Sequence, residues 1–284
     1  MIFEFIEKNR GIHKSNKLCD LFGVSRSGYY TWRTRPISAR RQHDIVLMKI
    51  IKELHQGYRR AYGAARLHQE LRQKGYECSR RRINRLMREL GIKAATTGLY
   101  AWRPGQHEFY SATGNQLAHE NSPQSTGEQW VGDFTYIKTR SGWFYHAVVL
   151  DLFSRKVVGW AFSRKRNTEL TKSALRMALH RHPPKPGCMF HSDQGIEYAA
   201  HEYRDMVMNA GMVRSMSRKG NPLDNAFVES FFHSMKAELI HHKLFESEIE
   251  AVAHIVEFTE FYNRERLHSG IGYLPPEKYE KLCA

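Results

Sequence analysis

The pattern of apolar and polar positions changes character near residue 125. Before it, apolar residues recur at i, i+3, i+4 and i+7, the spacing that places them on one face of a helix. After it, apolar, β-branched and aromatic runs alternate with helical patterns, which is typical of a sheet covered by helices. The chain is therefore expected to join an all-α N-terminal region to an α/β domain.

Two stretches of the N-terminal region, residues 15–33 and 62–91, have helix-turn-helix patterns, and a further helix is expected at 40–56. In the second stretch, Ser79 is a suitable N-cap for a helix that Gly91 ends. The pattern predicts a helical region of the helix-turn-helix type.

Positive charge gathers at the start of that last helix, where Arg80, Arg81 and Arg82 fill the first turn. Cations there oppose the helix dipole at roughly 0.3–1 kcal/mol each, a cost that an anionic partner would offset. Because the first residues of a recognition helix meet DNA, DNA contact is the favoured interpretation. Packing against the rest of the protein is the alternative. The arginines predicted to contact DNA are Arg59, Arg60, Arg80, Arg81, Arg82 and Arg85.

The second half of the chain predicts a mixed five-stranded sheet with helices on both faces. Its first three strands are joined by connections short enough for antiparallel hairpins. The expected strands are 130–138, 143–151, 155–163, 188–192 and 212–217, and the expected helices are 168–181, 199–210, one from about 223, and 247–263. A basic, Pro-containing tail follows the last helix.

Net charge separates the two parts. Residues 1–104 hold 23 Lys and Arg against 8 Asp and Glu, a difference of +15, whereas residues 105–284 hold 21 of each. A basic part joined to a neutral one indicates a segment that binds nucleic acid and a segment with another task. A merely solubilising surface is the alternative, which the arginines on the helix-turn-helix patterns weaken.

Several protein classes are excluded by composition. No apolar run approaches the roughly 20 residues of a membrane span, and the N-terminus has acids within its apolar stretch, unlike a signal peptide. The four cysteines are widely spaced, which favours reduced thiols in a cytoplasmic protein and argues against a zinc site. They are Cys19, Cys78, Cys188 and Cys283.

Three carboxylates carry the candidate chemistry: Asp133, Asp193 and Glu229, the last two separated by 35 residues. Asp133 lies within an apolar strand, where a charge is costly unless something compensates it. Mg²⁺ is a suitable compensator, since it binds through one or two carboxylates and keeps sites open for phosphate. In a very basic chain, these acids favour two-ion phosphoryl transfer on nucleic acid.

Further candidates lie beside these acids. Asn225 and Lys236 share a helical face with Glu229, so Lys236 is expected to grip a phosphate near the metals, with a solvated lysine as the alternative. Asp151 ends a strand before Ser154-Arg155, and a turn-stabilising or Arg-paired role is expected for it rather than catalysis.

These motifs together resemble a known family. The pattern runs Trp130-x-x-Asp133-Phe134-Thr135-Tyr136-Ile137, Leu150-Asp151-x-x-Ser154-Arg155, His191-Ser192-Asp193-x-Gly195 and Asp224-Asn225-Ala226-x-x-Glu229-Ser230-Phe231-Phe232. It resembles the retroviral-integrase-like DDE transposases of bacterial insertion sequences, in particular the second reading-frame product of the insertion-sequence-three family. The segment from Tyr62 to Met87 and the tail Tyr262-Asn263-x-x-Arg266-x-His268 fit that family too.

The resemblance implies a ribonuclease H-like core with the triad Asp133, Asp193 and Glu229, and Mg²⁺ or Mn²⁺, two ions, as cofactor. It implies cleavage and strand transfer of double-stranded DNA, at the element's terminal inverted repeats and at a target, by a nucleoid-associated homo-oligomer. The expected domains are a helical DNA-binding region 1–93, a linker 94–125, a catalytic core 126–245 and a C-terminal helix and tail 246–284.

Three alternatives remain open at this stage. The chain lacks a heptad zipper, so it resembles the second-frame portion, which acts either alone or fused to the upstream-frame protein. A catalytically silent DNA-binding partner of the longer fusion is a different possibility. A stand-alone nuclease of the ribonuclease H type would explain the acids but not the basic helices.

Overall fold

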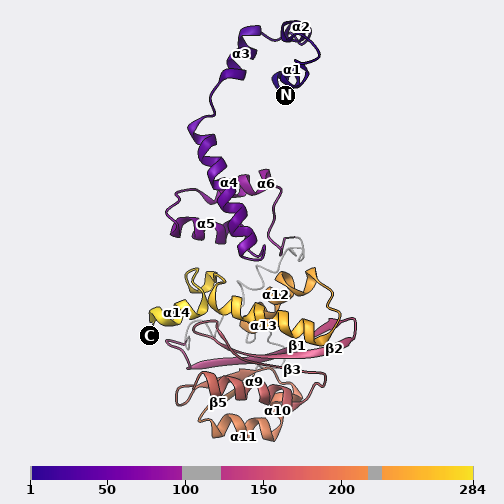
Figure 1. Ribbon diagram of the computed structural model, residues 1–284. Helices are drawn as coiled ribbons and strands as arrows, with labels where there is room; N and C mark the ends of the chain where they lie inside the picture. Colours follow the sequence, from indigo (N-terminus) through magenta and orange to yellow (C-terminus); the bar gives the residue numbers. More distant parts are fainter. Residues whose placement is uncertain (1, 98–122, 217–225, 284) are drawn as a thin grey trace. The chain divides into compact units, whose positions relative to one another are not determined.

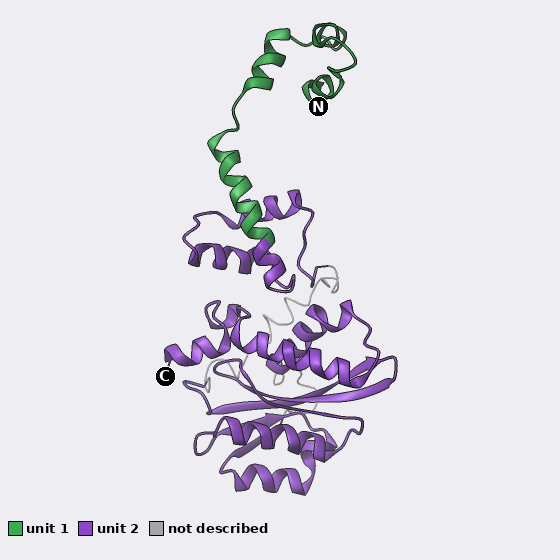
Figure 2. Ribbon diagram, viewed as in Figure 1, with its two compact units in different colours: residues 1–52 green, residues 53–284 purple. Residues whose placement is uncertain are grey.

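The structure is a computed structural model that describes residues 2–97, 123–216 and 226–283. The chain forms two compact units, Met1–Lys52 and Glu53–Ala284, coloured separately in Figure 2. The boundary between the units falls within helix α4 (Ala39–Gly57), which was expected at 40–56. The predicted linker lies largely outside the described residues, and the predicted domain limits stay predictions.

The first unit contains three short helices ahead of α4. They are α1 (Ile2–Asn9), α2 (Ser15–Leu21) and α3 (Arg26–Thr34). Helices α2 and α3 match the pattern expected at 15–33, and the Ser25 hydroxyl caps α3 by accepting a hydrogen bond from the Gly28 N–H at 2.8 Å. Helix α1 was not predicted, because its buried Ile6 finds its partners only in Leu18, Cys19 and Tyr29 of the later helices.

The second helix-turn-helix pattern folds as expected at the start of the second unit. Helix α5 (Ala64–Gln73) buries Leu67 and Leu71, and α6 (Arg80–Glu89) buries Ile83, Leu86 and Met87. The Ser79 hydroxyl accepts from the Arg82 N–H at 3.2 Å, which confirms the predicted cap. Gly75 and Gly91, with φ of 81° and 67°, supply the left-handed residues that end the two helices.

The remainder of the second unit is built on a mixed five-stranded sheet of order β3-β2-β1-β4-β5 (Figure 1). The first three strands pair antiparallel, and β4 and β5 run parallel to β1. The strands are β1 (Gln129–Thr139), β2 (Gly142–Asp151), β3 (Val157–Ser163), β4 (Met189–Ser192) and β5 (Val213–Met216). The sheet predicted from the apolar runs is therefore confirmed.

Helices cover both faces of this sheet, as Figure 1 shows. One face carries α9 (Thr168–Arg181), α10 (Ile196–Ala199) and α11 (His201–Asn209). The other carries α12 (Ala226–Glu238), packed on β1 and β2, and α13 (Glu248–Arg264), packed on β2 and β3. None of the helices in the described ranges is long and apolar enough to cross a membrane.

The contact between α9 and the sheet depends on one glycine. A Cβ placed on Gly159 of β3 would lie 2.3 Å from the Ala174 carbonyl oxygen and 2.7 Å from the Ala178 nitrogen. Only a residue without a side chain lets the helix backbone approach the strand this closely. The core under this face includes Trp130, Leu175 and Phe190, all fully buried or nearly so.

The opposite face buries a histidine under the helix that carries Glu229. The His146 ring on β2 stacks on Phe162 at 4.5 Å between centroids and meets the rings of Phe231 and Phe232 of α12 edge-on. The side chain is fully buried, and neither ring nitrogen has a hydrogen-bond partner. Burial accordingly lowers the pKa of His146 to about 3.

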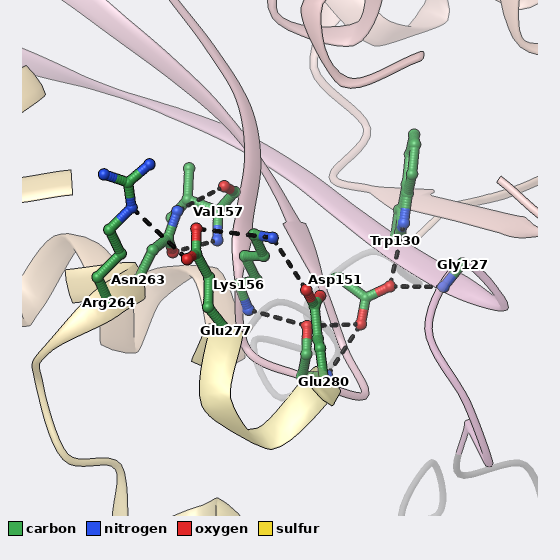
Figure 3. Close-up of polar contacts among 10 residues, drawn as sticks. Gly127, Trp130, Asp151, Lys156, Val157, Asn263, Arg264, Glu277 and Glu280 are labelled. Atoms are coloured by element: carbon green, nitrogen blue, oxygen red, sulfur yellow. Dashed lines mark hydrogen bonds and ion pairs between the residues drawn. The ribbon is translucent and has the colours of Figure 1, made fainter. Parts of the chain in front are cut away.

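The segment predicted as a basic tail contains a helix, α14 (Pro276–Cys283), after a short 3-10 turn at Ser269–Ile271. Pro276 opens α14, a position where proline's missing N–H costs nothing. Figure 3 shows what ties this segment to the sheet: Lys156 binds Glu280 at 2.9 Å, and Asn263 exchanges two hydrogen bonds with the Val157 backbone.

The helix-turn-helix segment of the second unit also contacts the C-terminal segment. The Tyr62 hydroxyl donates to the Glu265 carbonyl oxygen at 3.1 Å and accepts from the Leu267 N–H at 2.8 Å. The Arg66 Nε donates to the Leu267 carbonyl oxygen at 2.9 Å. Residues about 200 positions apart in the sequence are thereby held together.

Candidate active site

The edge of the sheet where β4 ends brings two of the three predicted acids side by side. β4 pairs with β1 only over Gln129–Gly132, and its last pair is Gly132 with Ser192. Asp133 and Asp193 are the next residues on these two neighbouring chains. Since paired strands lie about 4.8 Å apart, the topology itself sets the two aspartates next to each other.

The turn after β4 fixes the Asp193 carboxylate. Its Oδ1 accepts a hydrogen bond from the Gly195 N–H at 2.9 Å. A Cβ on Gly195 would lie 2.9 Å from that same oxygen and 3.1 Å from Glu197 Oε2, so a larger residue here would displace the Asp193 carboxylate. Glu197 in turn binds Arg166, whose guanidinium lies over the Phe134 ring.

Glu229 comes from the helix α12 that covers this part of β1, and its charge reaches the pair of aspartates. The pKa of Asp133 is raised to about 7, chiefly by burial and in smaller part by the charges of Asp193 and Glu229, whereas the Phe134 N–H and Lys236 favour the ionised form. Burial also raises the pKa of Glu229. The acids on the strand end and on the helix thus both act on the Asp133 carboxyl, and the triad itself stays a prediction.

The donor set fits a hard divalent cation, because it consists of carboxylate oxygens that disfavour each other's charge. Within the described ranges, no three His, Cys, Asp or Glu side chains already form a metal-binding cluster. The acids are therefore close enough for their charges to interact, but they are not close enough together to form a complete set of metal ligands. The pKa of Asp133 is raised mainly because the carboxyl is buried and in smaller part because Asp193 and Glu229 are near, and a cation at this edge would favour its ionised form.

Lys236 lies on the same helix, two turns beyond Glu229. Its ammonium sits 5.1 Å from the centre of the Tyr136 ring and interacts with the Asp133 charge. Burial lowers the pKa of Lys236, which the Asp133 charge opposes. Its position beside the acids agrees with the expected phosphate grip, whereas Asn225 lies outside the described residues.

Asp151 has the structural role that the sequence predicted. It is 1% exposed, and Figure 3 shows its carboxylate bound to Gly127 and Trp130. It accepts five hydrogen bonds, from the Gly127, Phe153 and Ser154 N–H groups, the Ser154 hydroxyl and the Trp130 indole. With its oxygens used in the turn, Asp151 has no free face for a substrate.

The predicted DNA-contact arginines fall into two groups. Arg80, Arg81 and Arg85 are exposed on α6, and Arg82 is half-buried there. Arg59 instead binds Glu257 at 2.6 Å and lies over the Phe261 ring of α13, an intramolecular role that the sequence did not suggest. Arg60 is exposed, and DNA contact by all six stays a prediction.

Two pairs of residues near the sheet were not singled out from the sequence. Arg166 and Glu197 are 31 residues apart yet pair beside Asp193, and no local pattern links them. The exposed rings of Tyr136 and Trp143 were not singled out either, and only the alternation of the two strands hinted that they share a face.

Known proteins match this chain over nearly its whole length. Models described as "Integrase core domain" match residues 123–222 and 210–276, and one described as "HTH-like domain" matches residues 42–98. A 31 kDa protein of the insertion element IS600 from Shigella sonnei is 38% identical over 94% of this chain and 100% of its own length. The InsF transposase of IS3A from Escherichia coli is 36% identical over 99% and 98%.

Solved structures were also compared. The catalytic core domain of HTLV-2 integrase in complex with magnesium is 18% identical and covers 55% of this chain and 97% of its own, with a TM-score of 0.45. At that score the likeness carries no weight, and the assignment rests on the sheet, the matched family models and the full-length relatives. The chain therefore belongs to the IS3 family of insertion-sequence transposases, metal-dependent polynucleotidyl transferases that bind DNA and act in DNA transposition and integration.

Proposed function

We propose that Asp133, Asp193 and Glu229 are the catalytic carboxylates of this transposase. The observation that carries the proposal is the edge where β4 ends, since it sets Asp133 beside Asp193 and within the field of Glu229. Active sites that move phosphoryl groups need positioned negative oxygens and little other chemistry. Asp151 and Glu197 are buried as well, but Asp151 is used in a turn and Glu197 in an ion pair with Arg166.

The proposed reaction consists of two in-line displacements at phosphorus. In the first, water attacks a phosphodiester at the element's end and frees a 3′-OH. In the second, that 3′-OH attacks another phosphodiester and joins the two strands, with no covalent protein intermediate. Mg²⁺ or Mn²⁺, in two sites, would activate the attacking oxygen and stabilise the leaving one.

The chain's own residues orient this site. Asp133 is held by the Phe134 N–H at 2.8 Å and Asp193 by the Gly195 N–H at 2.9 Å, so both carboxylates are fixed before DNA arrives. Lys236 favours the ionised form of Asp133 and is placed to bind a phosphate next to it. The buried side chains Phe231 and Phe232 anchor α12 to the sheet and hold Glu229 in register.

We further propose that the exposed arginines of α6 contact the duplex of the terminal inverted repeats. Their charges lie on the first turns of a helix-turn-helix segment, which is where such segments meet DNA. The protein is proposed to act as a homo-oligomer, because two element ends and a target must be held together. The chain acts either alone or fused to an upstream-frame protein. An overlapping reading frame upstream of the gene would indicate the fusion.

The triad is tested by the variants Asp133→Asn, Asp193→Asn and Glu229→Gln. The assay follows Mg²⁺-dependent nicking and joining of labelled duplexes that carry the inverted repeats flanking the gene. Each variant should bind the duplex normally and lose roughly 100-fold or more of both activities, because it removes one charge that the transition state needs.

The matched control is Asp205→Asn, an exposed aspartate of α11 away from the sheet edge. It should nick and join like the parent protein. Full joining by any one triad variant would refute the assignment of that residue. Binding without nicking by the parent protein would instead favour the silent DNA-binding partner.

A further inference from the structure

Two exposed aromatic rings lie at the end of the β1–β2 hairpin. Tyr136 and Trp143 are 57% and 52% exposed, and their ring centroids are 5.2 Å apart at an angle of 63°. Within the described residues from 53 onward, no other Phe, Tyr or Trp side chain is exposed. Burial of aromatic rings stabilises a fold, so an exposed pair indicates a surface that something else covers.

Two lysines flank this pair, which we call the ring platform (Tyr136 and Trp143). The Lys138 ammonium lies 5.4 Å from the centre of the Trp143 ring, and the Lys236 ammonium lies 5.1 Å from that of Tyr136. An apolar protein partner would have to cover both cations at a cost. A nucleic acid strand offers a base for each ring and a phosphate for each ammonium.

The platform lies at the free part of the same strand that carries Asp133. β4 leaves β1 after Gly132, so no described strand pairs with Phe134–Thr139 on that side. Tyr136 is three residues beyond Asp133, about 10 Å along an extended strand, and the alternation of β1 sends its side chain to the opposite face, so a DNA strand that meets both must pass over this edge of the sheet. That length corresponds to roughly three base steps of B-DNA at 3.4 Å each. Lys236 interacts with both the Tyr136 ring and the Asp133 carboxylate, and thereby connects the platform to the acids.

We propose that the ring platform stacks a DNA base that is unpaired within about three nucleotides of the scissile phosphate, while Lys138 and Lys236 bind the adjoining phosphates. This inference rests on the proposed function, because it takes Asp133 as the position of the reaction. An unpaired base next to the cut loses its stacking neighbours, and the rings replace them. The platform thereby holds the strand end open at the acids.

The test uses inverted-repeat duplexes with 2-aminopurine at each of the three positions beside the mapped nick. Binding by the parent protein should change the 2-aminopurine fluorescence at one of these positions, in a way that signals an unpaired, ring-stacked base. Tyr136→Ala/Trp143→Ala should abolish that change and weaken binding about 10-fold or more. Tyr136→Phe/Trp143→Phe should keep both, because the rings remain.

An abasic substitution at the same position separates stacking from a general loss of structure. With no base to stack, the parent protein and the double-alanine variant should bind equally well. Met208→Ala, an exposed apolar side chain of α11, should behave like the parent on every substrate. The proposal would be overturned if the double-alanine variant bound the abasic duplex as much more weakly than the parent protein as it binds the intact duplex. It would also be overturned if that variant gave the same 2-aminopurine signal as the parent protein.

The two proposals can fail separately. If Asp133→Asn still nicks the duplex, the proposed active site is wrong whatever the fluorescence does. If Asp133→Asn is inactive but the double-alanine variant gives the parent's fluorescence, the active site stands and the platform is wrong.

Discussion

The unbonded histidine under α12 gives the sharpest prediction about stability. His146 is fully buried, has no hydrogen-bond partner for either nitrogen, and has its pKa lowered from 6.5 to about 3. In the unfolded chain the ring binds a proton below about pH 6.5. The folded chain binds that proton only below about pH 3. As the pH falls below 6.5 the unfolded state therefore holds more protons, and the free energy of unfolding decreases.

The magnitude follows from these two pKa values. One pKa unit corresponds to about 1.36 kcal/mol. Proton binding to this single ring in the unfolded state therefore lowers the free energy of unfolding by about 0.2 kcal/mol at pH 7 and about 2 kcal/mol at pH 5. His146→Leu removes the proton-binding group and the two unbonded nitrogens with little change of volume. We expect it to raise the free energy of unfolding by about 1–3 kcal/mol at pH 7. The advantage should grow by about 2 kcal/mol at pH 5.

Urea unfolding followed by tryptophan fluorescence measures this difference, since Trp130 and Trp160 are buried in the sheet. Both proteins are compared at pH 5 and at pH 7, and the change in their difference isolates His146 from every other titrating group. His201→Leu, an exposed position on α11, is the control and should give a curve parallel to the parent's. An advantage of His146→Leu that is equal at the two pH values would refute the reasoning, because the ring would then titrate alike in both states.

Two further predictions concern packing. Gly159→Ala should lower the free energy of unfolding by about 1–3 kcal/mol or more, because the Cβ of the new alanine would clash with the α9 backbone. An unaltered urea midpoint would mean that α9 does not lie on β3 as described. Glu238→Gln should lower the free energy of unfolding by about 3–5 kcal/mol, because it leaves the buried Arg266 charge without its partner charge. The Arg266 and Glu238 side chains are only 5% and 2% exposed. Replacing both residues of this pair by methionine should recover most of that loss in the same urea assay.

Local signals in the sequence accounted for much of the secondary structure. Ser79 and Gly91 bounded α6 because capping depends on the nearest few residues, and the apolar runs gave all five strands for the same reason. Asp151 was separated from the catalytic candidates by its neighbours, since Ser154 supplies two of its hydrogen bonds. The triad was proposed from its motifs alone, and the sheet register then set Asp133 beside Asp193.

Other features depend on partners that are distant in the sequence. Helices α1 and α14 were missed because α1 finds its packing partners only in the folded unit and α14 finds its ion-pair partners only there. The contact of Arg59 with Glu257, a residue 198 positions away, was not expected from the sequence. The length of β4 decided that, among the described strands, none pairs with β1 on that side after Gly132, and no pattern in β1 itself reveals where its neighbour stops.

The sequence by itself thus determined the family and the type of most elements, and it singled out the three acids, because these depend on spacing and on residue type. The tertiary structure decided how those acids interact, which raises the pKa of Asp133 to about 7. It also decided that Lys236 reaches both Asp133 and Tyr136, and that His146 is left without a partner. The physical reason is that burial and charge coupling depend on which surfaces meet, and that is fixed only when the sheet and its helices pack.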